Sequence, residues 1–110
     1  MTREELIDKM VADVLDGFDF NKVHDVMVSL DWRWSIGNQE STVPSIYRLM
    51  KMAEDLLRYA AKSYGEKDYS DTSAGGFMAI LADGTLTLQF VLEENTAFEE
   101  DYINEKEEQQ

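Results

Sequence analysis

Few side chains in this sequence are suited to catalysis or to binding a transition metal. His24 is the only histidine and the chain has no cysteine, so a Ser-His-Asp arrangement would have to use a residue inside a predicted helix. No nucleophile elbow accompanies it. The same scarcity leaves zinc or iron without its usual nitrogen and sulfur ligands. We therefore expect a non-enzymatic protein with no catalytic residue, no metal site and no cofactor.

Two polar segments resemble ligand-binding loops without meeting their requirements. Asp68, Ser70 and Asp71 lie close together, but they lack the alternating ligands, the glycine and the distal glutamate of a calcium loop. The segment "SAGGF", residues 73–77, has paired glycines but no lysine and no following helix, which a phosphate loop needs. Its glycines are better explained as the start of a hairpin.

The segment "DWRWSIG", residues 31–37, has two interpretations. Tryptophan and arginine are enriched at binding hot spots, so it is a candidate for gripping a partner. Alternatively, Trp32, Trp34 and Ile36 alternate with Arg33 and Ser35. This period of two is typical of a half-buried strand and puts both indoles on one face, away from Arg33. The alternation favours the strand.

Three amphipathic helices are predicted around this strand. A capping box of Thr2 and Glu5 begins the first, which ends at Gly17. Asp19 caps the second, with Phe20, Val23, Met27 and Leu30 on one face. The third has the clearest apolar stripe: Ile46, Leu49, Met50, Ala53, Leu57, Ala60, Ala61 and Tyr64. The segment 66–76 is interpreted as a polar loop.

Residues 76–94 predict a hairpin with a defined register. Asp83-Gly84 is a preferred type I′ turn pair, which sets Leu81 opposite Leu86 and Phe77 opposite Phe90. The Trp segment is the natural third strand, since an isolated hairpin is only marginally stable. We thus predict an α+β fold: a three-stranded antiparallel sheet with about three helices on one face, in the order α-α-β-α-β-β.

The chain is strongly acidic, with 23 acidic and 10 basic residues and a net charge of −13. Such a surface repels nucleic acid and anionic membranes, so neither is an expected partner. Residues 93–110 alone hold eight acidic residues against one lysine. We expect a single domain over residues 1–95 and an acidic tail over 96–110, which is either a solubilising segment or a docking site.

Two function classes follow from these features. One is a non-catalytic inhibitor or DNA-mimic decoy that fills the basic groove of a nucleic-acid-binding protein, such as a defence nuclease. Its candidate partner-binding residues are Glu93, Glu94, Glu99, Glu100, Asp101 and Glu105. The other is an assembly module that binds a second copy of itself or another protein through the second face of the sheet, if no helix covers that face. Its candidate residues are Arg33, Met78, Ile80, Gln89 and Val91.

The length and hydropathy of the chain bear on its number of domains and on its cellular location. A chain of 110 residues is one domain of ordinary size, and it can bury a core without disulfides. No apolar run is as long as a membrane span and no leader-like segment opens the chain, so a cytoplasmic location is expected.

Four segments carry a resemblance to a known group of proteins. These are "VHDVMVSLDWRW", "VPSIYRLMKMAEDLL", "GGF" and "FVLE", within residues 20–93. Together they resemble small uncharacterised proteins encoded by phages and prophages. The resemblance implies a mobile-element origin and a bacterial cytoplasm, and it supplies no catalytic residue.

Overall fold

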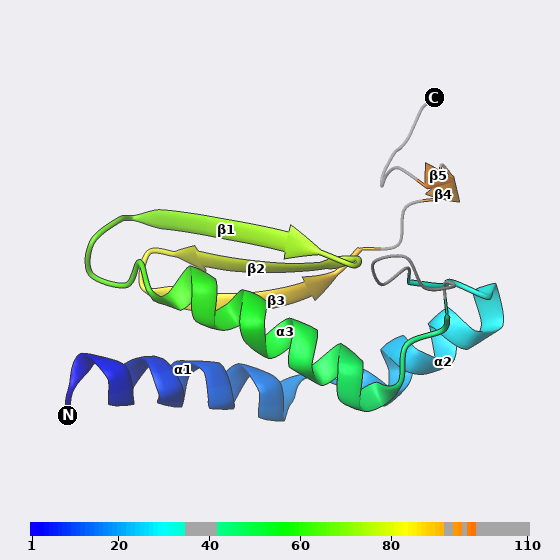
Figure 1. The fold of residues 1–110 in the computed structure, drawn as a ribbon. Helices are drawn as coiled ribbons and strands as arrows, with labels where there is room; N and C mark the ends of the chain where they lie inside the picture. Colours follow the sequence, from blue (N-terminus) through cyan, green and yellow to red (C-terminus); the bar gives the residue numbers. More distant parts are fainter. Residues whose placement is uncertain (35–41, 92–93, 96, 99–110) are drawn as a thin grey trace.

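The structure, a computed structural model, describes residues 1–34, 42–91, 94–95 and 97–98. Three helices precede a three-stranded antiparallel sheet, which confirms the α+β class (Figure 1). The helices are α1 (Arg3–Gly17), α2 (Phe20–Leu30) and α3 (Ile46–Ala61). The strands are β1 (Tyr69–Ala74), β2 (Phe77–Ala82) and β3 (Thr85–Phe90), followed by the short pair β4 (Glu94–Asn95) and β5 (Ala97–Phe98).

The helix starts follow the predicted capping residues. The Glu5 amide donates to Thr2 Oγ1 over 3.1 Å and the Thr2 amide donates to Glu5 Oε1 over 2.8 Å, which completes the capping box of α1. Asp19 caps α2 by accepting from the Lys22 amide over 3.0 Å. Ser45 caps α3. These caps satisfy amides that the first helical turn leaves unpaired.

The apolar stripe of α3 is rotated slightly from its predicted position. Leu49, Ala53 and Leu57 are fully buried as expected. Met50 is 43% exposed, and Leu56 takes its place in the core at 9%. The stripe shifts because α3 contacts all three strands on one side and α1 and α2 on others, so the buried sector is wide.

The predicted hairpin of β2 and β3 is confirmed in its register. Leu81 pairs with Leu86 and Phe77 pairs with Phe90. Asp83 and Gly84 have φ values of 51° and 79°, as a type I′ turn requires. The turn therefore fixes which side chains of both strands face the helices.

The third strand of the sheet is β1, and the prediction that the Trp segment fills this place was wrong. Trp34 makes only an isolated bridge to Thr42, and the element order is α-α-α-β-β-β. Residues 66–76, which were predicted to be a polar loop, contain β1. A strand at the edge of a sheet with one exposed face needs little apolar surface, so a polar sequence can form it. The helix-facing residues of β1 are small: Ser70, Thr72 and Ala74.

The helices lie on one side of the sheet. Figure 1 shows α1 and α3 along the same side, with α2 extending past the end of the strands. Helix α2 packs mainly on α3 and reaches the sheet through Phe20, whose ring lies 6.0 Å from that of Phe77. Among the described residues, no helix covers the other side. We call that side the open face.

Candidate protein-binding surface

Strand register defines the side chains of the open face. Residues paired across neighbouring strands project to the same side, and the helix-facing set is the one that contains buried Phe77, Ala79 and Leu81. The open face therefore consists of the other set: Tyr69, Asp71, Ser73, Met78, Ile80, Ala82, Thr85, Thr87 and Gln89. Its central row from β2 is half-buried, while the outer rows from β1 and β3 are exposed.

The open face is nearly free of charge. Strands β2 and β3 contain no charged residue, and β1 contains only Asp71. Charged residues make up 30% of the whole chain. The open face therefore consists mainly of apolar and hydroxyl side chains. In this depletion of charged residues it resembles the centres of protein interfaces.

Most of the predicted sheet-face residues lie where expected. Met78, Ile80 and Gln89 are on the open face. Val91 directly follows β3, and its amide donates to the Gly76 carbonyl over 2.8 Å. Arg33 is a correction: it is not in the sheet, because its segment is not a strand of it. Its guanidinium instead forms a 3.0 Å ion pair with exposed Asp31.

Sequence reasoning missed the contribution of β1. Tyr69, Asp71 and Ser73 form one exposed edge of the open face. A signal for them was present in Gly75-Gly76, which joins β1 to β2 with φ values of 60° and 91°. Paired positive φ angles are the mark of a type I′ hairpin turn.

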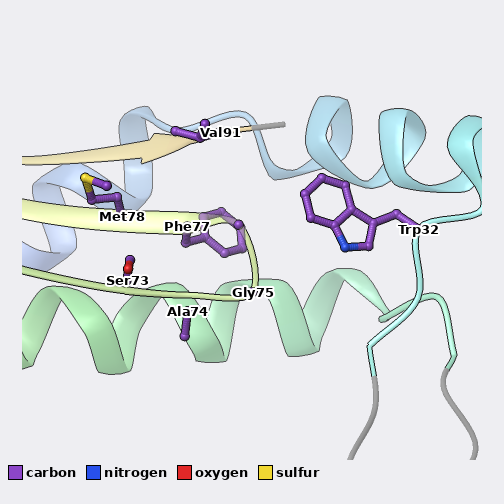
Figure 2. Close-up of a pocket in the computed structure, with 8 residues that line it drawn as sticks. Trp32, Ser73, Ala74, Gly75, Phe77, Met78 and Val91 are labelled. Atoms are coloured by element: carbon purple, nitrogen blue, oxygen red, sulfur yellow. The ribbon is translucent and has the colours of Figure 1, made fainter. Parts of the chain in front are cut away.

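A cleft of about 460 Å³ opens at the Gly75-Gly76 end of the sheet (Figure 2). We call it the turn cleft. In Figure 2, the Trp32 indole faces Phe77 across this cleft, and Met78 and Val91 form another part of its wall. None of the described residues that line it is charged, so it suits an apolar or aromatic group.

The tryptophans act as packing elements around this cleft. A Cβ added to Gly76 would lie 2.7 Å from Phe90 Cε1 and 3.1 Å from Trp32 Cη2, so only glycine fits there. The rings of Trp32 and Phe90 are 5.3 Å apart, and those of Phe90 and Phe77 are 5.2 Å apart. Both tryptophans are half-buried against the core while Arg33 is exposed, as the alternation predicted.

Tyr69 and Asp71 form a hydrogen-bonded pair of ionisable residues on the open face. The Tyr69 hydroxyl donates to Asp71 Oδ2 over 3.3 Å. The pKa of Tyr69 is raised above its ordinary value, first by the negative charge of Asp71, then by desolvation and by this hydrogen bond. Asp71 is the one residue with a carboxyl side chain among the residues of the open face.

The two segments that resemble ligand-binding loops lie in and around β1 and its turn to β2. Ser70 and Asp71 are neighbours in β1 and project to opposite sides of the sheet, so they do not converge on one cation. Gly75 and Gly76 form the turn between β1 and β2. No group of three or more potential ligand side chains that could hold a metal occurs within the described ranges.

The acidic candidate residues fall largely outside the part of the chain that the structure describes. Glu93, Glu99, Glu100, Asp101 and Glu105 are all in this category, and Glu94 is in β4. The remaining acidic residues are unevenly spread. Residues 1–31 hold eight acidic and three basic residues, whereas residues 42–91 hold six and five.

Comparison with protein-family models, with curated proteins and with solved structures finds no match to this chain. In the described part of the chain, no helix has both the length and the apolar character to cross a membrane.

Proposed function

We propose that this protein is a non-catalytic assembly module that binds through its open face, and that the partner is a second copy of the chain. One observation carries the proposal: a uniform, nearly uncharged face on a chain of net charge −13. Charge is depleted at the centres of protein interfaces.

The charge distribution favours a second copy in one specific orientation. Two copies that met through α1 and α2 would bring together segments with a large acidic excess, which repel each other. Two copies that met through their open faces would bring together Met78, Ile80 and the threonines of β3. Only Asp71 adds charge to such an interface.

The size of the open face predicts a weak dimer. Three strands of six residues span roughly 20 Å by 14 Å, from the usual rise per residue and strand spacing. This footprint is well below the ~800 Å² that each partner buries in a standard interface. We therefore expect a reversible dimer that forms in the micromolar range or above.

The test combines Ile80→Lys with Val91→Lys. One lysine lies on the open face and the other directly after β3, at the turn cleft. Both add charges that a partner would have to desolvate, so sedimentation equilibrium should give a monomer at concentrations where the unmodified chain dimerises. The matched control is Tyr47→Lys, since Tyr47 is an apolar residue of α3 that is 74% exposed. A monomeric unmodified chain at high concentration would overturn the proposal.

An acidic docking surface is the second candidate function. The observation that favours it is the charge of the first two helices, where Glu4, Glu5, Asp13 and Asp16 are exposed on α1. Together with the C-terminal carboxylates, they would imitate the phosphates of a nucleic acid and occupy a basic groove, such as that of a phage-defence nuclease.

Salt and charge reversal test this second candidate. Binding to a basic partner should weaken steeply as salt is raised, because exposed charges are screened. Lysine substitutions at Glu99, Glu100, Asp101 and Glu105 should weaken it as well, while the Ile80→Lys and Val91→Lys variant should bind normally. A partner that is indifferent to both salt and charge reversal contradicts the decoy function.

A further inference from the structure

We propose that the turn cleft is the socket for Tyr69 of a second copy, so that two Tyr69 side chains and two clefts lock a two-fold dimer. The inference rests on the proposed function, because it requires the open faces of two copies to meet. It goes further by naming the residue that enters, the site that receives it and the symmetry of the assembly.

Tyr69, which we call the knob, and the turn cleft, which is its socket, lie at opposite ends of β1. Tyr69 begins β1 and is 55% exposed on the open face. Ser73, four residues later on the same face, lines the turn cleft. At the usual rise of a strand, their Cα atoms are roughly 13 Å apart, with Asp71 midway between them.

This spacing is self-complementary under a two-fold rotation. Consider two copies whose open faces are stacked, with a two-fold axis midway between the two sheets and perpendicular to the strands. Rotation about this axis makes the strands of one copy run opposite to those of the other. If the axis passes over Asp71, Tyr69 of each copy lies over Ser73 of the other. Both contacts form together, as in the isologous interfaces of two-fold dimers.

The chemistry of the turn cleft matches a phenol ring. Its apolar wall includes Trp32, Phe77, Met78 and Val91, and its volume of about 460 Å³ is ample for one aromatic side chain. Aromatic rings pair favourably in tilted or edge-on arrangements. On entering the cleft, the Tyr69 hydroxyl would exchange its hydrogen bond to Asp71 of its own copy for one with the Ser73 hydroxyl at the rim. Because none of the described residues that line the cleft is charged, they offer no ion-pair partner to an acidic side chain.

Cysteine cross-linking gives a direct geometric test. The chain has no native cysteine, so a variant that combines Tyr69→Cys with Ser73→Cys has no other thiol. Stacked sheets lie about 10 Å apart, beyond the ~7 Å between Cα atoms that a disulfide allows, so a short bismaleimide is added to bridge the two thiols. Within one copy the two thiols are roughly 13 Å apart along the strand, which is too far for this linker. We expect a covalent dimer with a 69–73 linkage by mass spectrometry. Each single variant should remain uncross-linked, because the two-fold axis separates identical positions.

Mixing two defective variants tests the knob and the socket separately. Tyr69→Ala removes the knob and Ser73→Phe fills the socket, so each should raise the dimer dissociation constant at least tenfold. An equimolar mixture should dimerise again, because the intact Tyr69 of one variant meets the intact cleft of the other. Tyr69→Phe keeps the ring and should dimerise nearly as well as the unmodified chain. Circular dichroism of each variant verifies that the fold is retained.

The outcomes separate this inference from the proposed function. If Ile80→Lys with Val91→Lys abolishes the dimer while Tyr69→Ala and Ser73→Phe leave it unchanged, the open-face interface stands and the socket is wrong. A mixture that stays monomeric, or a cross-link at other positions, also overturns the socket. If the unmodified chain is monomeric or forms oligomers larger than a dimer, the two-fold assembly itself is overturned.

Discussion

The indole of Trp34 lies directly on the backbone of Gly75. A Cβ on Gly75 would come 2.8 Å from Trp34 Cζ2, closer than a carbon contact allows. The segment that contains the tryptophans is thereby fixed against the hairpin turn of β1 and β2. Its only described backbone ladder contact is the bridge between Trp34 and Thr42, with hydrogen bonds of 2.7 and 2.8 Å.

Gly75→Ala should destabilise the protein by about 3 kcal/mol, because it combines a positive-φ penalty of ~1–2 kcal/mol with displacement of a packed ring. Gly84→Ala is the matched control. Gly84 is also in a type I′ turn, at φ 79°, but its nearest neighbour would be 3.9 Å away. Chemical denaturation should show a clearly larger loss for Gly75→Ala. Equal losses would mean that the Trp34 contact contributes nothing.

Trp34→Ala should cost about 3 kcal/mol through lost core packing, whereas Arg33→Ala should cost at most about 1 kcal/mol. Arg33 forms its ion pair with Asp31 where both side chains are at least half exposed. Trp34→Phe is the informative control: it keeps an aromatic ring and removes an indole N–H that is buried without a hydrogen-bond partner among the described residues. Thermal melts of the three variants should rank Trp34→Ala lowest. The reverse order would return the tryptophans to the role of an exposed binding surface.

Tyr69 should titrate above the ordinary tyrosine pKa of about 10, because Asp71 raises its pKa. The native chain then keeps this proton at pH values where the unfolded chain has released it. The contribution of Tyr69 to stability is therefore complete below the ordinary pKa and is lost as pH rises through the native value. Tyrosinate absorbance of Asp71→Asn, compared with the unmodified chain, should show one tyrosine moving to lower pH. Tyr69→Phe identifies that tyrosine by removing its signal.

Asp71→Asn should tighten the dimer several-fold. The proposed two-fold axis passes over Asp71, so association brings two carboxylates together and removes them from water, and both effects oppose binding. Asp83→Asn is the control, because it removes one negative charge in the β2–β3 turn, away from the axis. Sedimentation equilibrium at matched ionic strength measures the difference. Equal effects of the two substitutions would point to overall charge rather than to the position of the axis.

Local signals predicted much of this fold because they act over a few residues. The capping box of Thr2 and Glu5 and the Asp83-Gly84 turn each specify backbone geometry on their own. The β2–β3 register followed from that turn together with the apolar alternation from Phe77 to Phe90. The positions of Met78 and Ile80 on the face opposite Phe77 could be predicted from the same pattern, whereas the absence of a helix over that face could not.

The identity of the third strand could not be predicted by the same reasoning. The sequence of β1, "YSDTSA", buries no large apolar residue, so its place in the sheet depends on tertiary contacts with β2 and α3. The Trp segment has the stronger alternation, but its indoles are used against Gly75 and Gly76. The error carried over to the candidate site, where Arg33 was included and Tyr69 was omitted.

The order of helices before strands has a consequence for folding during synthesis. Helix α1 rests on β3, and α3 rests on all three strands, so every helix is made before the surface that covers its apolar stripe. A ribosome adds roughly 5–20 residues per second, which leaves Val11 and Leu49 without their strand partners for several seconds. The two type I′ hairpins close over short sequence distances and fold quickly once made. The last strand of the three-stranded sheet, β3, is therefore the element that completes the core, and a chain halted before it would expose its helices to aggregation or to chaperones.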